Sequence, residues 1–289
     1  MTAAGSIART FGLFTLVFAV MFAIAWALAF VLSAWSLSFF LVFAVIAVLI
    51  NLFTYYASSA LVLRGYRCKV VSEQEAPELH KMVAEVAVAA GVPKPKVAIM
   101  PSASPNAFAT GRNPKHAVVA YTTGILELLN EKELRGVTAH ELGHVKNYDT
   151  LVMTATATVS AFIAYAIYFA GMSAASRGRG GGFGAMIIAY FAGMLVAALI
   201  RTFVSRRREY GADATGSRIL GDTTGLQNAL LKLDYATKGR PMKQAREASA
   251  HLFIVNPLSG RQAGSMVAGL FMSHPPLEKR VARLRDMSE

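Results

Sequence analysis

LNEKELRGVTAHELGHVKN, residues 129–147, carries the strongest structural signal in the chain. Asn130 is a favourable N-cap, because its side-chain oxygen can accept a hydrogen bond from a first-turn N–H. Glu133 stands where the second half of a capping box is expected. We therefore predict a helix from about Glu131 to Asn147.

Two histidines within this helix form the pattern H-E-x-x-H. His140 and His144 are four residues apart, so both imidazoles lie on one face, with Cβ atoms about 5–6 Å apart. In that arrangement both can reach one tetrahedral zinc ion. Glu141 projects beside them, where a general base for water would act. With 6 histidines in the chain, a chance match is expected only about 0.005 times. The alternative is a solvated helix that carries two unrelated histidines.

A catalytic zinc site needs a third protein ligand, and Glu209 is the candidate. The helix predicted above ends where a third apolar run begins, and Glu209 lies just past the end of a fourth. If these runs form a hairpin, Glu209 returns to His140 and His144. Asp213 is four residues further on the same helical face and can accept the free ring N–H of a ligand histidine. The alternatives are a Glu209 that pairs with neighbouring arginines and an Asp213 that is an ordinary surface carboxylate.

Composition indicates a membrane protein. Hydrophobic residues make up 54% of the chain and charged residues 16%, and the mean hydropathy is +0.43, values typical of polytopic membrane proteins. The net charge of +12 suits contacts with anionic lipid headgroups. Nucleic acid is not expected as a partner, because the basic run Arg206–Arg208 is short and abuts an apolar segment. The single cysteine, Cys68, excludes an intramolecular disulfide.

Four apolar runs predict two transmembrane hairpins. The first pair covers about 11–32 and 37–63, and the second pair 150–176 and 180–200, against about 20 residues needed to cross a bilayer core. The first pair shows no amphipathic period, which disfavours two buried helices of a soluble protein. The expected organisation is an N-terminal hairpin at 1–69, a protease domain at 70–149 and 205–289, and a second hairpin at 150–204.

Charge flanking these runs predicts their orientation. Arg9, Arg64 and Arg206–Arg208 mark the ends of both hairpins as cytoplasmic by the positive-inside rule. Arg177 and Arg179, in the loop of the second hairpin, oppose this orientation but are outnumbered. We expect an integral protein of the cytoplasmic (inner or plasma) membrane, in contact with the lipid bilayer, with its active site on the cytoplasmic side.

The remaining segments suggest a mixed α and β domain. Helices are expected at about 73–90 and 223–237, with a short basic helix from about Pro276. Short strands are expected at Lys96–Met100 and His116–Tyr121, on either side of a segment rich in Pro, Ser, Asn and Gly. Asn106–Gly111 lies between these strands.

Taken together, the motifs resemble the HtpX heat-shock membrane metallopeptidases and their relatives, the CAAX prenyl proteases. HELGH is followed about 65 residues later by EYGAD, with a hydrophobic hairpin between them. NAFATG, FIVNPL and SHPP, at 106–111, 253–258 and 273–276, extend the resemblance over nearly the whole chain. The layout of four spans at this length is closer to HtpX than to the longer prenyl proteases.

The resemblance implies a mainly α, polytopic membrane protein with an α+β zincin-like (gluzincin) cytoplasmic protease domain and one Zn²⁺ per chain. NAFATG is similar to the edge strand that pairs with substrate backbone, and a plain loop is the alternative. His274 and Arg280 match a pair near the reaction centre that would stabilise the oxyanion. Without the resemblance, His274 suggests a structural histidine before a proline turn. The substrate-binding residues implied are Asn106, Ala107, Phe108 and Ala109.

The expected function is that of a membrane-integrated zinc endopeptidase. The resemblance implies that its substrates are misfolded or damaged membrane proteins, cleaved at the cytoplasmic face in protein quality control and stress response. A non-catalytic zinc-containing adaptor is an alternative, but a structural zinc is normally closed by four protein ligands and the pattern here offers three. A CAAX-type processing protease of the same chemistry is the other alternative. Whether the chain forms a homo-oligomer is left open.

Overall fold

The structure is a computed structural model, and it describes residues 59–150, 182–239, 253–254 and 275–287, with scattered positions at 53–57 and 152–167. The predicted span at 11–32, most of that at 37–63, and His274 lie outside the described residues. The chain divides into two compact units, one formed by 1–55 with 151–201 and the other by 56–150 with 202–289. The candidate site lies in the second unit.

Helix α7, Gly182–Leu220, contributes residues to both units. Among the described residues, its portion Ile187–Leu220 is the one helix long and apolar enough to cross a membrane, with a mean hydropathy of 2.1 over its most apolar window. The apolar run predicted at 180–200 is therefore part of a longer helix, which continues past Glu209 and Asp213. Both acidic residues consequently share one rigid element.

The second unit contains a small mixed sheet in the order β1-β2-β4-β3. The strands are β1 Lys69–Val70, β2 Lys96–Met100, β3 Ala107–Thr110 and β4 Val118–Thr122. β2 pairs with β4 in parallel, and the other two pairings are antiparallel. The order leaves β3 at the edge of the sheet. β3 lies within the NAFATG segment at 106–111, so this part of the chain is a strand and not a plain loop.

The predicted strand His116–Tyr121 begins later than expected. Pro114–His116 forms a short 3-10 turn, η1, and only from Val118 does the chain pair with β2. All five residues of β4 are buried, which is characteristic of a strand covered on both faces. The predicted β2 is confirmed at its expected bounds.

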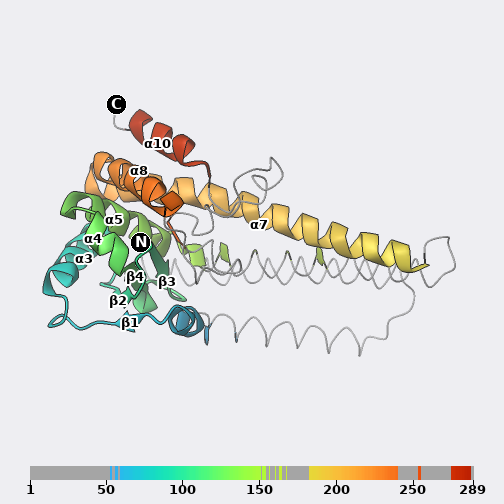
Figure 1. Ribbon diagram of the computed structural model, residues 1–289, viewed down its shortest axis with the longest axis horizontal. Coiled ribbons are helices and arrows are strands. Elements are labelled where there is room, and N and C mark those ends of the chain that lie inside the picture. Colours follow the sequence, from blue (N-terminus) through green and yellow to red (C-terminus); the bar gives the residue numbers. More distant parts are fainter. Residues whose placement is uncertain are drawn as a thin grey trace. The chain divides into compact units, whose positions relative to one another are not determined.

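Helices pack on the sheet (Figure 1). α3, Pro77–Ala90, has a proline in its first turn. This proline explains why the observed helix begins later than the predicted range of 73–90. α4 is Thr123–Leu128 and α5 is Glu131–Lys146, where both halves of the predicted capping box are present. α8, Thr224–Gly239, packs on α5, and α10, Leu277–Asp286, packs on α8.

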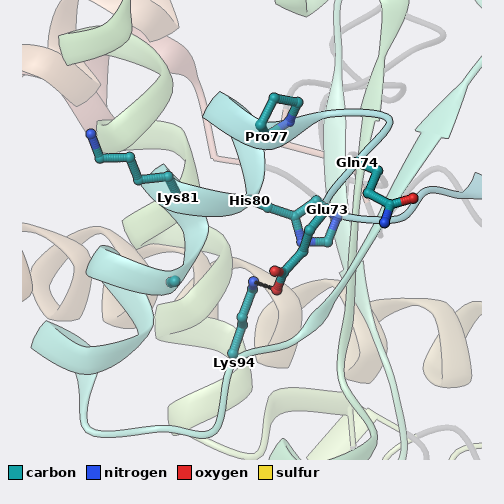
Figure 2. A pocket seen from close by; sticks show the side chains of 7 residues that line it. Glu73, Gln74, Pro77, His80, Lys81 and Lys94 are labelled. Atoms are coloured by element: carbon teal, nitrogen blue, oxygen red, sulfur yellow. Dashed lines mark hydrogen bonds and ion pairs between the residues drawn. The ribbon is translucent and has the colours of Figure 1, made fainter.

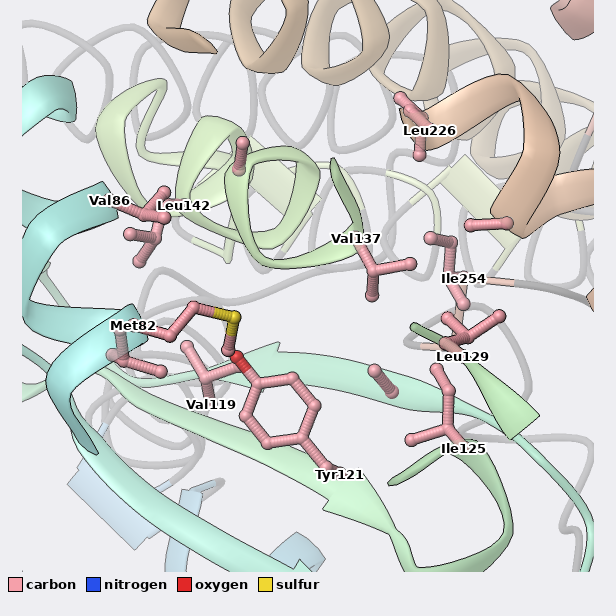
Figure 3. Close-up of a cluster of buried hydrophobic side chains, with 14 of the residues drawn as sticks. Met82, Val86, Val119, Tyr121, Ile125, Leu129, Val137, Leu142, Leu226 and Ile254 are labelled. Atoms are coloured by element: carbon pink, nitrogen blue, oxygen red, sulfur yellow. The ribbon is translucent and has the colours of Figure 1, made fainter. Parts of the chain in front are cut away.

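The main core lies between the sheet and the helices α3 and α5 (Figure 3). Tyr121 of β4 is fully buried there and shares a hydrogen bond of 2.8 Å with Thr138 of α5. Burying each such apolar side chain stabilises the fold by about 1.5–3 kcal/mol. The metal-binding pattern of α5 is thereby held on a well-packed base. Further members of this core are Met82, Val86, Val119, Val137, Leu142, Leu226 and Ile254.

α5 and α7 approach closely because two glycines stand at their contact. A Cβ at Gly216 would lie 2.9 Å from the backbone N of His140. A Cβ at Gly143 would lie 3.0 Å from the carbonyl oxygen of Ala212. Real Cβ atoms do not tolerate such distances to backbone, so a side chain at either position would separate the helices.

Candidate metal centre

Three side chains from α5 and α7 converge on one point. His140 and His144 come from α5 and Glu209 comes from α7, and each offers one ligand atom within 4.8 Å of the others. The Nε2 atoms of the two histidines are 3.2 Å apart. Oxygens of Glu209 lie 3.4 Å from His144 Nε2 and 3.7 Å from His140 Nε2.

These separations match the edges of a tetrahedron around a metal ion. Zinc binds imidazole nitrogen and carboxylate oxygen at about 2.0–2.2 Å, so two ligand atoms on one tetrahedral ion are about 3.3–3.6 Å apart. The 3.4 Å separation lies within that interval, and the 3.2 Å and 3.7 Å separations, the latter to the other Glu209 oxygen, lie just outside it. The donor set of two imidazoles and one carboxylate therefore fits a tetrahedral divalent ion.

Hydrogen bonds on the far side of each ring fix which nitrogen faces the centre. His140 Nδ1 lies 2.9 Å from Asp213 Oδ1, and His144 Nδ1 lies 2.5 Å from Asp149 Oδ2. A carboxylate only accepts, so each Nδ1 carries the proton and each Nε2 presents a lone pair. Burial lowers the pKa of His140, which favours its neutral form. Two lone pairs that face each other with a carboxylate repel unless a cation lies between them.

Asp213 is itself held by Arg280 of α10. The guanidinium donates from Nε to Asp213 Oδ2 at 2.9 Å and from Nη2 to Asp213 Oδ1 at 2.7 Å. It also donates from Nη1 to the carbonyl oxygen of Ile254 at 2.9 Å, and the same Nη1 is 3.3 Å from Glu209. Arg280 is almost fully buried. The structure thus brings Asp213 to His140 and Arg280 to both carboxylates of α7.

Glu141 lies in the same buried region, where no side chain of the described residues donates a hydrogen bond to its carboxylate and the backbone N–H of Ala109 faces it. Burial raises the pKa of Glu141 to about 7, and the charge of Glu209 adds to this while His144 opposes it. A buried carboxylate that only one backbone N–H faces is costly in a folded protein. Its position beside the converging ligand atoms suits a group that exchanges a proton with water.

Sequence reasoning missed Asp149 and Arg208. Asp149 contacts His144 as described above, and its other oxygen lies 3.0 Å from Arg208 Nε. Asp149 comes two residues after the predicted end of the metal-binding helix, where a helical periodicity gives no information about its direction. Its five-residue spacing from His144 was the only available signal.

The four residues expected to contact substrate lie on or next to the edge strand. Asn106 is fully buried, and its carbonyl oxygen accepts a hydrogen bond of 2.9 Å from Thr122 N–H of β4. Alternation along an antiparallel pair then turns the backbone of Phe108 toward β4 and that of Ala107 and Ala109 away from it. In agreement, Ala107 O accepts from Ile254 N–H at 3.1 Å. Of the four, Ala109 also affects the pKa of Glu141 through its backbone N–H.

A surface pocket elsewhere in this unit contains none of these groups (Figure 2). It lies where α3 begins, and an ion pair of 2.5 Å between Glu73 and Lys94 borders it. His80 donates or accepts at its wall through Nε2, 3.1 Å from the carbonyl oxygen of Val71. The candidate site is therefore assigned from the chemistry of the His, His and Glu cluster and not from surface shape.

Charge in the cluster gives an independent indication of a cation. Four buried carboxylates, Glu141, Asp149, Glu209 and Asp213, face two guanidinium groups, those of Arg208 and Arg280. With all six ionised, two negative charges remain without a counter-charge among these groups, and one still remains when Glu141 is protonated. Isolated charge is expensive to bury, and a divalent ion would offset both charges.

Comparisons with known proteins agree on one group of enzymes. Residues 73–288 match Peptidase family M48. A protease HtpX homolog of Pyrococcus furiosus is 47% identical over 248 residues, or 84% of each chain. One of Desulfatibacillum aliphaticivorans is 49% identical over 247 residues, or 83% of this chain and 78% of the relative.

A solved structure shares the fold. The crystal structure of S. mikatae Ste24p aligns with a TM-score of 0.59 at 18% identity, over 98% of this chain and 67% of Ste24p. The mainly helical architecture with a small mixed sheet is therefore a Ste24p-like fold.

Proposed function

The chain belongs to peptidase family M48 and is a metalloprotease, and from this premise we propose that it is a zinc-dependent endopeptidase. His140, His144 and Glu209 would hold one Zn²⁺. The observation that carries the proposal is the convergence of two Nε2 lone pairs and a carboxylate at tetrahedral spacing. Three ligands leave one position open, as in catalytic rather than structural zinc sites.

Glu141 would act as the general base. When bound, zinc supplies Lewis acidity to a water molecule and to the scissile carbonyl. Glu141 accepts the proton of the attacking water and then passes it to the leaving amine. A carboxyl with a pKa near 7 is suited to both steps, since it takes and releases a proton at neutral pH.

Arg280 would stabilise negative charge that develops on the substrate oxygen. Three of its contacts are with Asp213 and the carbonyl oxygen of Ile254, so its position is fixed before substrate arrives. Its charge acts over short range in a buried site, where electrostatic effects are strong. His274 is proposed as the second group in this role on the basis of the sequence resemblance.

Substrate would add as a further strand to the outer edge of β3 near Ala109, because the outward carbonyl oxygen of Ala107 already accepts from Ile254 N–H. The backbone groups of Ala107 and Ala109 point away from β4, and Ala109 lies next to Glu141. Peptide backbone that pairs there would bring a scissile bond to the general base, which is the β-augmentation mode of recognition. Asn106 and Phe108 would support this edge from the β4 side.

The enzyme would act as a polytopic protein of the cytoplasmic membrane. The apolar portion of α7 supports a membrane location, and the flanking arginines support a cytoplasmic site. The proposed substrates are misfolded or damaged membrane proteins, and the proposed role is quality control under stress. Support for this role comes from the resemblance to HtpX proteins.

Metal content and proteolysis measured together test the proposal. Detergent-purified protein should contain about one zinc per chain and should cleave an unfolded soluble protein. Ortho-phenanthroline should abolish cleavage, its non-chelating meta isomer should not, and added zinc should restore it. Cleavage that is indifferent to the chelator would contradict a zinc-dependent mechanism.

A further inference from the structure

The second ligand histidine has a hydrogen-bonding partner that the H-E-x-x-H pattern does not include. Asp149 Oδ2 lies 2.5 Å from His144 Nδ1. Asp149 is buried, with 5% of its surface exposed. Little water can therefore reach this carboxylate. The His144 ring is the main hydrogen-bonding partner of its Oδ2 atom.

An unusual backbone conformation directs Asp149 to this place. Tyr148 has a φ of 59°, in the left-handed region that side chains other than glycine rarely adopt. The chain leaves α5 at Asn147, and the left-handed residue turns it so that Asp149 faces back toward His144. A left-handed residue that carries a bulky side chain costs about 1–2 kcal/mol. Such a cost is retained only when surrounding structure imposes it.

Arg208 holds the other oxygen of Asp149. Its Nε lies 3.0 Å from Asp149 Oδ1, and only 14% of its side chain is exposed. Arg208 is also the neighbour of Glu209 on α7, so the ion pair links the end of α5 to the helix that supplies the third ligand. At the first histidine, Asp213 likewise contacts His140 and Arg280 contacts Asp213, but Arg280 donates two hydrogen bonds whereas Arg208 forms an ion pair only.

The geometry points to Asp149 as a positioning residue of the metal centre: it orients the His144 ring, and Tyr148 and Arg208 hold it in place. A carboxylate on Nδ1 keeps the proton there, leaves Nε2 as the ligand and increases its basicity. This inference rests on the proposed metal site and adds a residue to it. Removing such a partner typically weakens metal binding about 10–100-fold.

The first test measures zinc affinity by competition with a chromophoric chelator. Asp149→Asn keeps the shape of the side chain but loses its charge, and we expect zinc to bind about 10–100-fold more weakly. Glu85→Gln is the matched control, because it makes the same change in an ion pair with Arg135 that lies outside the site. The control should stay within about twofold of wild type.

The visible spectrum of the Co²⁺-loaded protein provides a readout that global stability does not move. Asp149→Asn should alter the ligand-field bands, because these bands report the geometry and basicity of the ligands. Glu85→Gln should leave them unchanged. A wild-type spectrum and affinity in Asp149→Asn would overturn the inference.

A double variant separates orientation from simple charge pairing. If Asp149 only neutralises Arg208, then Asp149→Asn with Arg208→Gln should recover wild-type affinity, and that result would overturn the inference. If Asp149 orients His144, the double variant should bind zinc as weakly as Asp149→Asn alone.

The backbone variants test the same idea without removing the carboxylate. Tyr148→Gly keeps the left-handed turn available and should retain affinity within about threefold, whereas Tyr148→Val disfavours that turn and should lose about tenfold or more. Equal affinities in the two variants would refute the role of the turn, and this pair decides the matter if Asp149→Asn does not fold. Failure of the wild-type protein to bind zinc would instead refute the proposed function.

Discussion

Substituting Gly216 by alanine should disturb the metal centre without changing any ligand side chain. The added Cβ would lie 2.9 Å from His140 N and 3.0 Å from His140 Cα, both backbone atoms that cannot rotate away. Ordinary contacts begin at 3.4 Å, so α7 must move from α5 by about 0.5 Å. Metal–ligand distances tolerate only about ±0.2 Å. Glu209 and Asp213 move with α7, and we therefore expect zinc affinity to fall at least about tenfold.

Gly211→Ala is the matched control on the same helix. Apart from its own helix backbone, no described residue has an atom within 4 Å of a Cβ built at Gly211. Both substitutions gain about 0.8–1.0 kcal/mol of helix propensity, so the difference between them isolates the steric effect. Overpacking costs about 1–3 kcal/mol, and metal-free Gly216→Ala should be less stable than metal-free Gly211→Ala by that amount.

Two measurements decide the question: zinc affinity by chelator competition and denaturant unfolding of the metal-free proteins. Gly211→Ala should bind zinc like wild type and unfold at a slightly higher denaturant concentration. If Gly216→Ala binds zinc within twofold of Gly211→Ala, the close approach of the helices does not determine ligand geometry. The reasoning from Cβ contacts would then be wrong.

Three further predictions follow from the site and the charge pattern. Glu141→Gln should keep zinc and lose peptidase activity by about 10²–10⁴-fold, measured by metal analysis and cleavage of an unfolded protein; near-normal activity would remove Glu141 from the mechanism. Glu209→Gln should bind zinc at least about tenfold more weakly, because a neutral amide replaces a charged ligand, and a full complement of zinc after dialysis would point to another third ligand. Single cysteines introduced next to Glu141, after replacement of Cys68, should resist membrane-impermeant reagents in intact cells, whereas cysteines at 33–36 should react; efficient labelling beside Glu141 would invert the orientation.

Local signals in the sequence predicted the elements that depend on local interactions. The helix from Glu131 begins with its predicted capping box, because Asn130 and Glu133 satisfy the first-turn N–H groups without help from distant residues. β2 was predicted at its observed bounds, because a segment rich in Pro, Ser, Asn and Gly follows it directly in the chain. The start of α3 was misplaced by a few residues, since Pro77 and not Glu73 occupies the first turn.

The features that the sequence did not reveal depend on tertiary structure. Tyr148 disfavours the left-handed conformation that it adopts, so nothing local predicted that Asp149 would return to His144. The edge position of β3 was expected from the family resemblance alone, because it depends on pairing with β4, which follows it in the chain. Gly143 and Gly216 became meaningful only when the two helices were seen to touch.

The acidic residues at the proposed metal site and the small residues at the helix contact lie on one face of α7. Glu209, Ala212, Asp213 and Gly216 are spaced at i, i+3, i+4 and i+7, which places them on a single stripe of the helix. The stripe faces α5: its acidic members contact His140, and its small members meet backbone at Gly143 and His140.

A hydrophobic stripe in the sequence would predict a helix face that packs in the core. This stripe has no apolar side chain larger than alanine, so from the sequence it resembles a solvated face. Its small residues allow the close approach of α5 and α7, and this approach lets Asp213 reach His140 and brings Glu209 to the proposed metal position. The acidic and small residues along α7 therefore serve a single requirement, the close approach of α7 to α5 at the proposed metal site.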